Sequence, residues 1–209
     1  MEQNPAAVRR WLATEFPAIR ARARQEGGVV LWLDEMGVRS DAAAGRSWAP
    51  TGQTPVIKRT GKRFRVNMIS AISAAGLLRF RLFTGSFAGS FTGLVFIDFL
   101  RRLVRDLAGR KVHLIVDGHP GHHAKLVTAW VARNTARIEL HFLPGSSPEL
   151  GPVELLNQDV TANAAGRRRP RTAAELTREL RAYVRRRQRQ PEIVARFFTH
   201  PDTSYAATQ

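Results

Sequence analysis

The sequence predicts an α/β domain built on a mixed five-stranded sheet that is flanked by helices. Two apolar runs that end in acid, "GGVVLWLDE" and "KVHLIVDGH", have the composition of strands buried on both faces. Segments with helical spacing lie between and after the strands, so the order is strand, hairpin, helix, strand, helix, strand, helix. This alternation is typical of a sheet with helices packed on its faces.

The first half of the chain begins with a helical segment and then supplies three strands. Pro17 is expected to break the helical segment in two, and we expect residues 1–26 to form a connector rather than core. The first strand ends at Asp34. The runs "FRVNMISAIS" and "LLRFRLF" then predict a hairpin in which Arg79 and Arg81 share one face.

The second half alternates helices and strands. "SFTGLVFIDFLRRLVRDLAG" predicts a long helix closed by Gly109, and the strand "KVHLIVDGH" is followed by a helix over about 122–135 and the strand "IELHF". "TAAE" from Thr172 is a capping-box pattern that opens a last long helix, which ends before Pro191. The apolar side of this helix carries Leu176, Leu180, Tyr183 and Val184.

The charge of the chain favours a polyanionic partner. The 209 residues include 33 Lys plus Arg against 17 Asp plus Glu, a net charge of +16, so nucleic acid is the first candidate and a merely solvated surface is the alternative. Two segments concentrate the charge, "KRTGKRFR" and the stretch around the last helix. The candidate DNA-binding residues are Lys58, Arg59, Lys62, Arg63, Arg167, Arg168, Arg169, Arg185, Arg186 and Arg187.

The absence of cysteine limits the chemistry. Disulfides, thiolate zinc sites and a cysteine nucleophile are excluded, so a metal must be held by oxygen or imidazole, which makes hard cations natural candidates. The start of the chain lacks the apolar run of a secretion signal, and no stretch approaches eighteen consecutive apolar residues. We therefore expect a cytoplasmic protein without a membrane partner.

Two aspartates follow the apolar strands. If these strands are parallel neighbours, Asp34 and Asp117 emerge together at the carboxyl edge of the sheet, where open α/β sheets place their ligands. Close carboxylates either share a proton or hold a cation, and oxygen ligands suit Mg²⁺ or Mn²⁺. The alternative is that each aspartate simply begins a turn.

A third carboxylate comes from the segment "FLPGSSPELGPVELL". "GPVE" predicts a helix start with Gly151 at the N-cap and Glu154 at the third helical position, where the helix dipole favours the ionised carboxylate. From this local pattern, a capping role and a role in the carboxylate site are equally open.

Several neighbours of these carboxylates are expected to be minor. Strand alternation predicts that Glu35 points away from Asp34, which leaves it out of the metal site. Without metal-ligand spacing, His119, His122 and His123 are expected to be surface residues, and a contact with DNA is the alternative.

The motifs "WLDEMGVRSD", "GRSWAPTGQTP", "HLIVDGHPGHHAK" and "FLPGSSPELGPVELLNQDV", in this order, resemble the catalytic domain of DDE transposases of the bacterial insertion-sequence and Tc1/mariner superfamily. The resemblance covers about residues 27–207 and implies an RNase H-like fold. It matches the family's catalytic and metal-binding acids to Asp34, Asp117 and Glu154. These acids would hold two Mg²⁺ or Mn²⁺ ions for DNA cleavage at the element's ends and strand transfer into target DNA.

The resemblance also implies an organisation and partners. Residues 27–165 would form the catalytic domain, and residues 166–209 a basic helical extension packed on it. A dimer is expected in the active complex. Because few residues precede the first strand, a separate helix-turn-helix product of the same element is a possible partner, and a catalytically inactive DNA-binding transposase remnant is the alternative function.

The chain departs from the family pattern at two places. Gly151 precedes Pro152 where asparagine is usual, and a lysine common near Thr161 is missing, which puts a phosphate contact in doubt. A different Mg²⁺ phosphotransfer enzyme is disfavoured, because no second aspartate stands two residues after Asp34.

Overall fold

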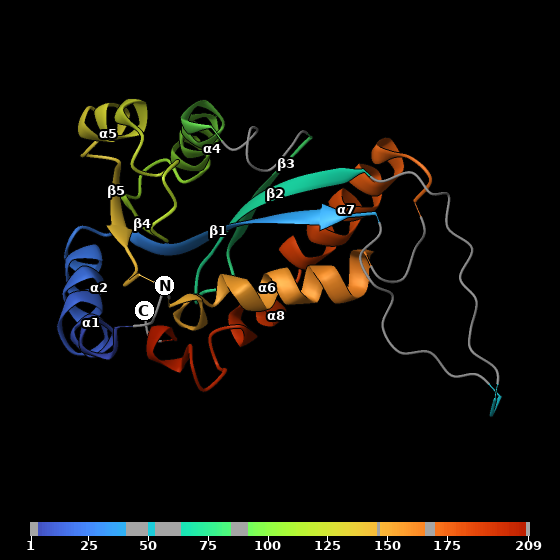
Figure 1. Cartoon of the computed structure of the whole chain (residues 1–209). Helices are drawn as coiled ribbons and strands as arrows, with labels where there is room; N and C mark the ends of the chain where they lie inside the picture. The colour runs from blue at the N-terminus through green and yellow to red at the C-terminus, as the bar shows by residue number, and fades with distance from the viewer. Residues whose placement is uncertain are drawn as a thin grey trace.

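Five strands form one mixed sheet in the order β3-β2-β1-β4-β5 (Figure 1). The computed structural model describes residues 4–40, 50–52, 64–84, 92–145, 147–165 and 170–207. β1 is antiparallel to β2 and parallel to β4, which is parallel to β5. The predicted mixed five-stranded sheet is therefore confirmed. The strands are β1 Val29–Arg39, β2 Arg65–Ile72, β3 Leu78–Thr84, β4 Val112–Val116 and β5 Ile138–Phe142.

Helices cover both faces of the sheet (Figure 1). One layer consists of α4 (Gly93–Asp106) and α5 (Lys125–Ala132). The other layer consists of α1 (Pro5–Arg10), α2 (Phe16–Gln25), α6 (Val153–Val160), α7 (Ala173–Gln188) and α8 (Pro191–Arg196).

None of the helices in the described ranges is long and apolar enough to span a membrane.

The first strand is longer than the sequence predicts. Its parallel ladder with β4 runs from Val29 to Trp32, but β1 continues to Arg39 as the antiparallel partner of β2. Asp34 consequently lies in the middle of β1 rather than at its end. It still lies just beyond the parallel ladder, on the side where β4 ends, so the predicted edge is where Asp34 emerges.

The N-terminal helical segment is continuous, contrary to the expected break at Pro17. A π-helical turn, Trp11–Glu15, joins α1 to α2, and the Phe16 N–H donates to the Trp11 carbonyl five residues earlier. Pro17 falls in the first turn of α2. The wider turn removes the need for an N–H group at the proline, so the chain stays helical through it.

This segment is also core and not only a connector. Trp11 and Phe16 are buried against Trp32 of β1, with ring centroids 6.4 and 5.4 Å from the Trp32 ring. The Trp11 Nε1–H donates to the Tyr205 hydroxyl over 3.2 Å, and that hydroxyl donates to the Leu150 carbonyl. The two ends of the described chain therefore pack together on one face of the sheet.

The last long helix begins as predicted. The Thr172 hydroxyl accepts from the Glu175 N–H, while the Glu175 carboxylate accepts from the Arg171 N–H, one residue before the usual partner of a capping box. All four predicted apolar residues of α7 are buried in the core that also contains Trp32. The helix ends at Gln188, before Pro191, as expected.

The core position of the first segment is testable by substitution. We expect Trp11→Ala to lower the free energy of unfolding by about 3 to 5 kcal/mol, because it removes a fully buried indole and leaves a cavity. The matched control is Leu12→Ala, since Leu12 is 37% exposed and should cost well under about 1 kcal/mol. Urea unfolding checks both variants, and equal small losses would mean that residues 1–26 are only a connector.

Candidate active site

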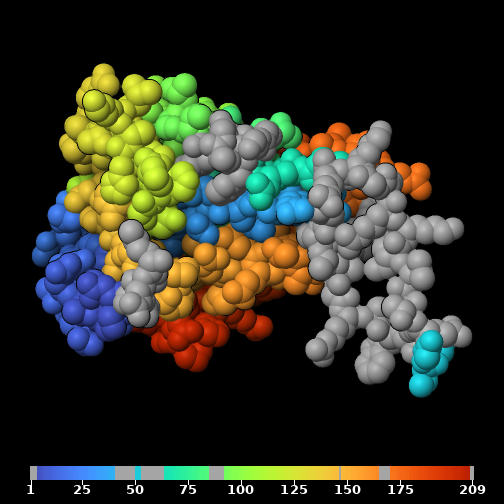
Figure 2. Space-filling model, in the orientation of Figure 1, coloured from blue at the N-terminus to red at the C-terminus, as the bar shows by residue number. Residues whose placement is uncertain are grey.

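The site forms where β1 meets α6, and these two elements lie side by side at the surface (Figure 1 and Figure 2). Asn157 of α6 donates its Nδ2–H to the Asp34 Oδ2 over 2.6 Å, which turns the Asp34 side chain toward α6. Glu154 lies in the first turn of the same helix, three residues before Asn157. This spacing places Glu154 and Asn157 on one side of α6, facing Asp34.

The electrostatics of Asp34 show that several carboxyl groups crowd together. Its pKa is raised to about 8, first by burial and then by repulsion from Glu154, Glu35 and Asp117. A hydrogen bond from the Glu35 backbone N–H lowers the pKa but does not offset these effects. The structure therefore brings the three predicted carboxylates, Asp34, Asp117 and Glu154, into one neighbourhood.

Asp117 is the first residue after β4 and has a half-exposed side chain. Its Oδ1 accepts from the His119 N–H and lies 3.0 Å from the His122 Nδ1. Burial alone would raise the pKa of Asp117, but the hydrogen bonds from His122 and His119 outweigh it and lower the pKa. Asp117 is thus an ionised acceptor held in place by its own loop.

His122 links Asp117 to Glu35, which corrects the expectation that it lies at the surface. Its Nε2 lies 2.9 Å from the Glu35 Oε1, and the imidazole is fully buried, with its ring centroid 4.6 Å from that of Phe96. Burial lowers the pKa of His122, but the hydrogen bonds to Asp117 and Glu35 outweigh burial and raise the pKa to about 10. The ring is therefore an imidazolium that donates from both nitrogens. His122 is therefore not a surface residue.

Glu35 does point to the opposite face of β1 from Asp34, as alternation predicts. Glu35 nevertheless lies next to the site, because the loop after β4 carries His122 to it. Ligand atoms of Glu35, Asp117 and His122 all lie within 4.8 Å of one another. By contrast, His123 is exposed and stacks on Phe142, as expected of a surface histidine.

The start of α6 differs from the prediction by one residue. Pro152 rather than Gly151 is the N-cap, and Glu154 is the second helical residue, whose N–H donates to the Gly151 carbonyl. Glu154 stays in the first turn of α6, as predicted. Gly151 thus lies one residue before the N-cap, and α6 has no side-chain cap.

Asn157 is a site residue that sequence reasoning missed. It is 7% exposed, and its Oδ1 is buried without a hydrogen-bond partner among the described residues. The available signal was its position three residues after Glu154 on a helix. An orphaned amide oxygen beside crowded carboxylates is a donor set of hard oxygens, which fits Mg²⁺ or Mn²⁺ better than softer metals.

The family profile described as DDE superfamily endonuclease matches residues 29–177, which contain all three carboxylates. The chain belongs to this family. No curated protein is similar enough in sequence to serve as a relative of this DDE domain. The similarity predicted from the four motifs is therefore confirmed at the level of the family.

Solved structures confirm the RNase H-like fold. The catalytic domain of Mos1 mariner transposase superposes with a TM-score of 0.61 at 12% identity, covering 100% of this chain and 98% of that one. The Mos1 mariner paired end complex with Mn gives a TM-score of 0.66 at 16% identity. That match covers 99% of this chain and 64% of the Mos1 chain, so the DDE domain spans about two thirds of that transposase.

The raised pKa of Asp34 predicts a pH dependence of stability in the absence of divalent ions. Because the folded-state value of about 8 lies above the ordinary 3.8, the folded domain holds a proton that the unfolded chain has released. Stability should fall as pH rises through this window, with a slope of up to about 1.4 kcal/mol per pH unit. Asp34→Asn should remove that slope and be more stable than the parent above pH 8.

Urea unfolding in a chelator at several pH values measures this difference. Glu192→Gln, at an exposed carboxylate of α8, is the control and should keep the parental profile. Parallel profiles for the parent and Asp34→Asn would contradict the crowding of carboxylates at the site.

Proposed function

We propose that this DDE domain is the catalytic domain of a transposase, which cleaves DNA at element ends and transfers the strand into target DNA. The observation that carries the proposal is that Asp34 lies buried beside Glu154, Glu35 and Asp117, so that burial first and repulsion from these carboxylates second raise its pKa to about 8. A domain that retains such mutual repulsion gains stability when a divalent cation neutralises it. Membership of the DDE endonuclease superfamily supports the same chemistry.

The chain's own residues would prepare this site for phosphoryl transfer. Two Mg²⁺ or Mn²⁺ ions, when bound by the three carboxylates, would supply activation of water and charge neutralisation at the phosphodiester. Asn157 holds the Asp34 carboxylate toward α6, and His122 holds Asp117 toward β1. Such fixed positioning is the main protein contribution to phosphoryl transfer.

The solved relatives support the finer activity. Their descriptions name a paired end complex with Mn, a paired end complex with Mg and a strand transfer complex of Mos1. For this domain we accordingly propose binding to transposon ends and target DNA, with two ions at the carboxylates. A dimer in the active complex, a separate helix-turn-helix product of the same element and a cytoplasmic location stay predictions.

A hollow lined by arginines offers a path for the DNA backbone. It has a volume of about 370 Å³ and lies between β3, α4 and α7. Asp98 and Asp106 pair with Arg81 and Arg79 from β3, which leaves a positive excess in the hollow. The arginines that line it are Arg79, Arg81, Arg102, Arg105, Arg181 and Arg185.

Arg187 has a structural role that removes it from the proposed DNA-binding set. Its Nε and Nη2 lie 2.7 and 2.9 Å from the two oxygens of Asp159, and the side chains are only 16% and 15% exposed. The Tyr183 hydroxyl donates to the same carboxylate. Arg185 and Arg186 are exposed, so they remain candidates.

The other predicted basic residues lie outside the described part of the chain. They are Lys58, Arg59, Lys62, Arg63, Arg167, Arg168 and Arg169. Their contact with DNA stays a prediction.

Nicking of DNA tests the catalytic proposal. We expect the wild-type domain with Mn²⁺ to nick a plasmid carrying the element's ends, and Asp117→Ala to be slower by at least about a hundredfold, because a metal ligand is lost. Glu192→Gln should nick at the parental rate. Equal nicking by wild type and Asp117→Ala would refute the proposal, and Mn²⁺ binding without any nicking would favour the catalytically inactive remnant.

Salt dependence tests the DNA path separately from catalysis. Replacing both Arg181 and Arg185 with Gln should weaken binding to all DNA sequences alike and flatten the log-log salt slope by about 1.8, at roughly 0.9 per lost phosphate contact. The control replaces Arg9 and Arg24, exposed arginines of α1 and α2, with Gln. Fluorescence anisotropy over a salt series provides both slopes, and an equal effect of both double variants would mean that only net charge matters.

A further inference from the structure

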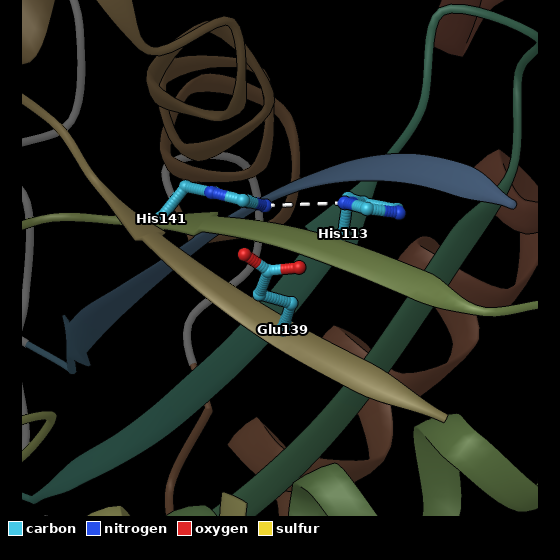
Figure 3. A group of neighbouring side chains, drawn as sticks. All are labelled: His113, Glu139 and His141. Carbon is cyan, nitrogen blue, oxygen red and sulfur yellow. Dashed lines mark hydrogen bonds between the residues drawn. The ribbon is translucent and has the colours of Figure 1, made fainter. Parts of the chain in front are cut away.

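A second cluster of metal-ligating side chains lies on the face of the sheet covered by α2. Figure 3 shows His113 of β4 beside Glu139 and His141 of β5. His113 is the register partner of Glu139, and His141 lies two residues further along β5, so the three side chains project from the same face. His113 is fully buried, whereas Glu139 is one third exposed and gives solvent access to the cluster.

The distances match those of a metal site with two imidazole ligands. The His113 Nδ1 lies 3.2 Å from the His141 Nε2. One ligand atom from each of the three residues lies within 4.8 Å of those of the other two. Two nitrogens bound to one tetrahedral Zn²⁺ at about 2.0–2.1 Å lie roughly 3.3 Å apart. Without an ion this pair is a hydrogen bond, so the His141 proton would have to lie on Nδ1 for both facing nitrogens to bind one ion.

The surroundings of His113 prepare its Nδ1 as a ligand. The Glu26 Oε2 lies 2.8 Å from the His113 Nε2 and accepts a hydrogen bond from Nε2–H, which leaves the Nδ1 lone pair facing His141.

We propose that His113, Glu139 and His141 bind one divalent transition-metal ion, with Zn²⁺ as the fitting member of the class. Two imidazole nitrogens and one carboxylate oxygen form a ligand set that zinc accepts and that Mg²⁺ disfavours. The ion ties β5, an edge strand, to β4, whose carboxyl end leads into Asp117. Its role is structural, and it does not depend on the proposed transposase activity.

Two cations already contact the Glu139 carboxylate and set the affinity of the site. Arg22 lies 2.7 Å from the Glu139 Oε1, and Lys111 lies 3.5 Å from its Oε2 while also contacting Glu26. The Arg22 side chain is 46% exposed and can turn into solvent when the ion enters. Removing Arg22 should consequently strengthen metal binding, which is the opposite of what a purely structural hydrogen-bond network predicts.

The experiment titrates tag-free protein with Zn²⁺ by calorimetry and with Co²⁺ by visible absorption. All variants are made in an Asp117→Asn background, which weakens the carboxylate site. We expect one ion per chain, a loss of at least about tenfold in affinity for His141→Ala, and tighter binding for Arg22→Gln. His123→Ala, at an exposed histidine next to the same strand, is the matched control and should bind like its parent.

Three outcomes would overturn the proposal. They are no stoichiometric Zn²⁺ binding at micromolar concentrations, equal affinity for His141→Ala and His123→Ala, or Zn²⁺ binding that appears only when Asp117 is intact. Circular dichroism shows whether His141→Ala is folded. If His141→Ala is unfolded, the milder substitution Glu139→Gln replaces it and should also weaken Zn²⁺ binding. A negative result here would not bear on the proposed transposase activity, because the nicking assay tests the carboxylate site and not this cluster.

Discussion

The parallel pairing of β1 with β4 is the constraint on which the site depends. The ladder stops at Trp32 and Ile115, so Asp34 and Asp117 each lie two residues beyond its last pair, at the same end of the two strands. β1 nevertheless continues as a strand because β2 pairs with it, and Asp34 lies opposite Ser70 of β2. Asp34 is therefore fixed by a sheet on one side and is open to α6 on the other.

This arrangement concentrates negative charge, and the domain neutralises its acids unequally. Glu35 and Asp117 share the His122 imidazolium, and Asp159 is paired with Arg187. Asp34 is instead hydrogen-bonded to neutral amides, those of Asn157 and of the Glu35 backbone. Burial and then repulsion from Glu154 and Glu35 therefore raise the pKa of Asp34, because neutral donors compensate a buried charge less completely than a cation does. A bound cation would offset both effects.

The sequence predicted features that depend on local pattern. Strands with apolar runs, the hairpin and the capped helix α7 all follow from spacing within a few residues. Asp34 and Asp117 were predicted from apolar runs that end in acid, and Glu154 from a helix start. The misses involve partners that are distant along the chain. His122 meets Glu35 over 87 residues, and Trp11 meets Tyr205 over 194 residues. Periodicity shows that a face is apolar or polar, but it does not show which element will cover that face.

The helix α7 shows how position on one helix divides the basic residues into two roles. Its buried stripe runs through Leu180 and Tyr183, and Arg187 continues it one turn after Tyr183, which directs its guanidinium to Asp159. Arg181 and Arg185 are also one turn apart, but they lie beside the stripe and line the arginine hollow. The arginines look equivalent in composition. Only their angle around the helix axis, relative to the buried stripe, separates a residue that stabilises the fold from one that is available to a phosphate backbone.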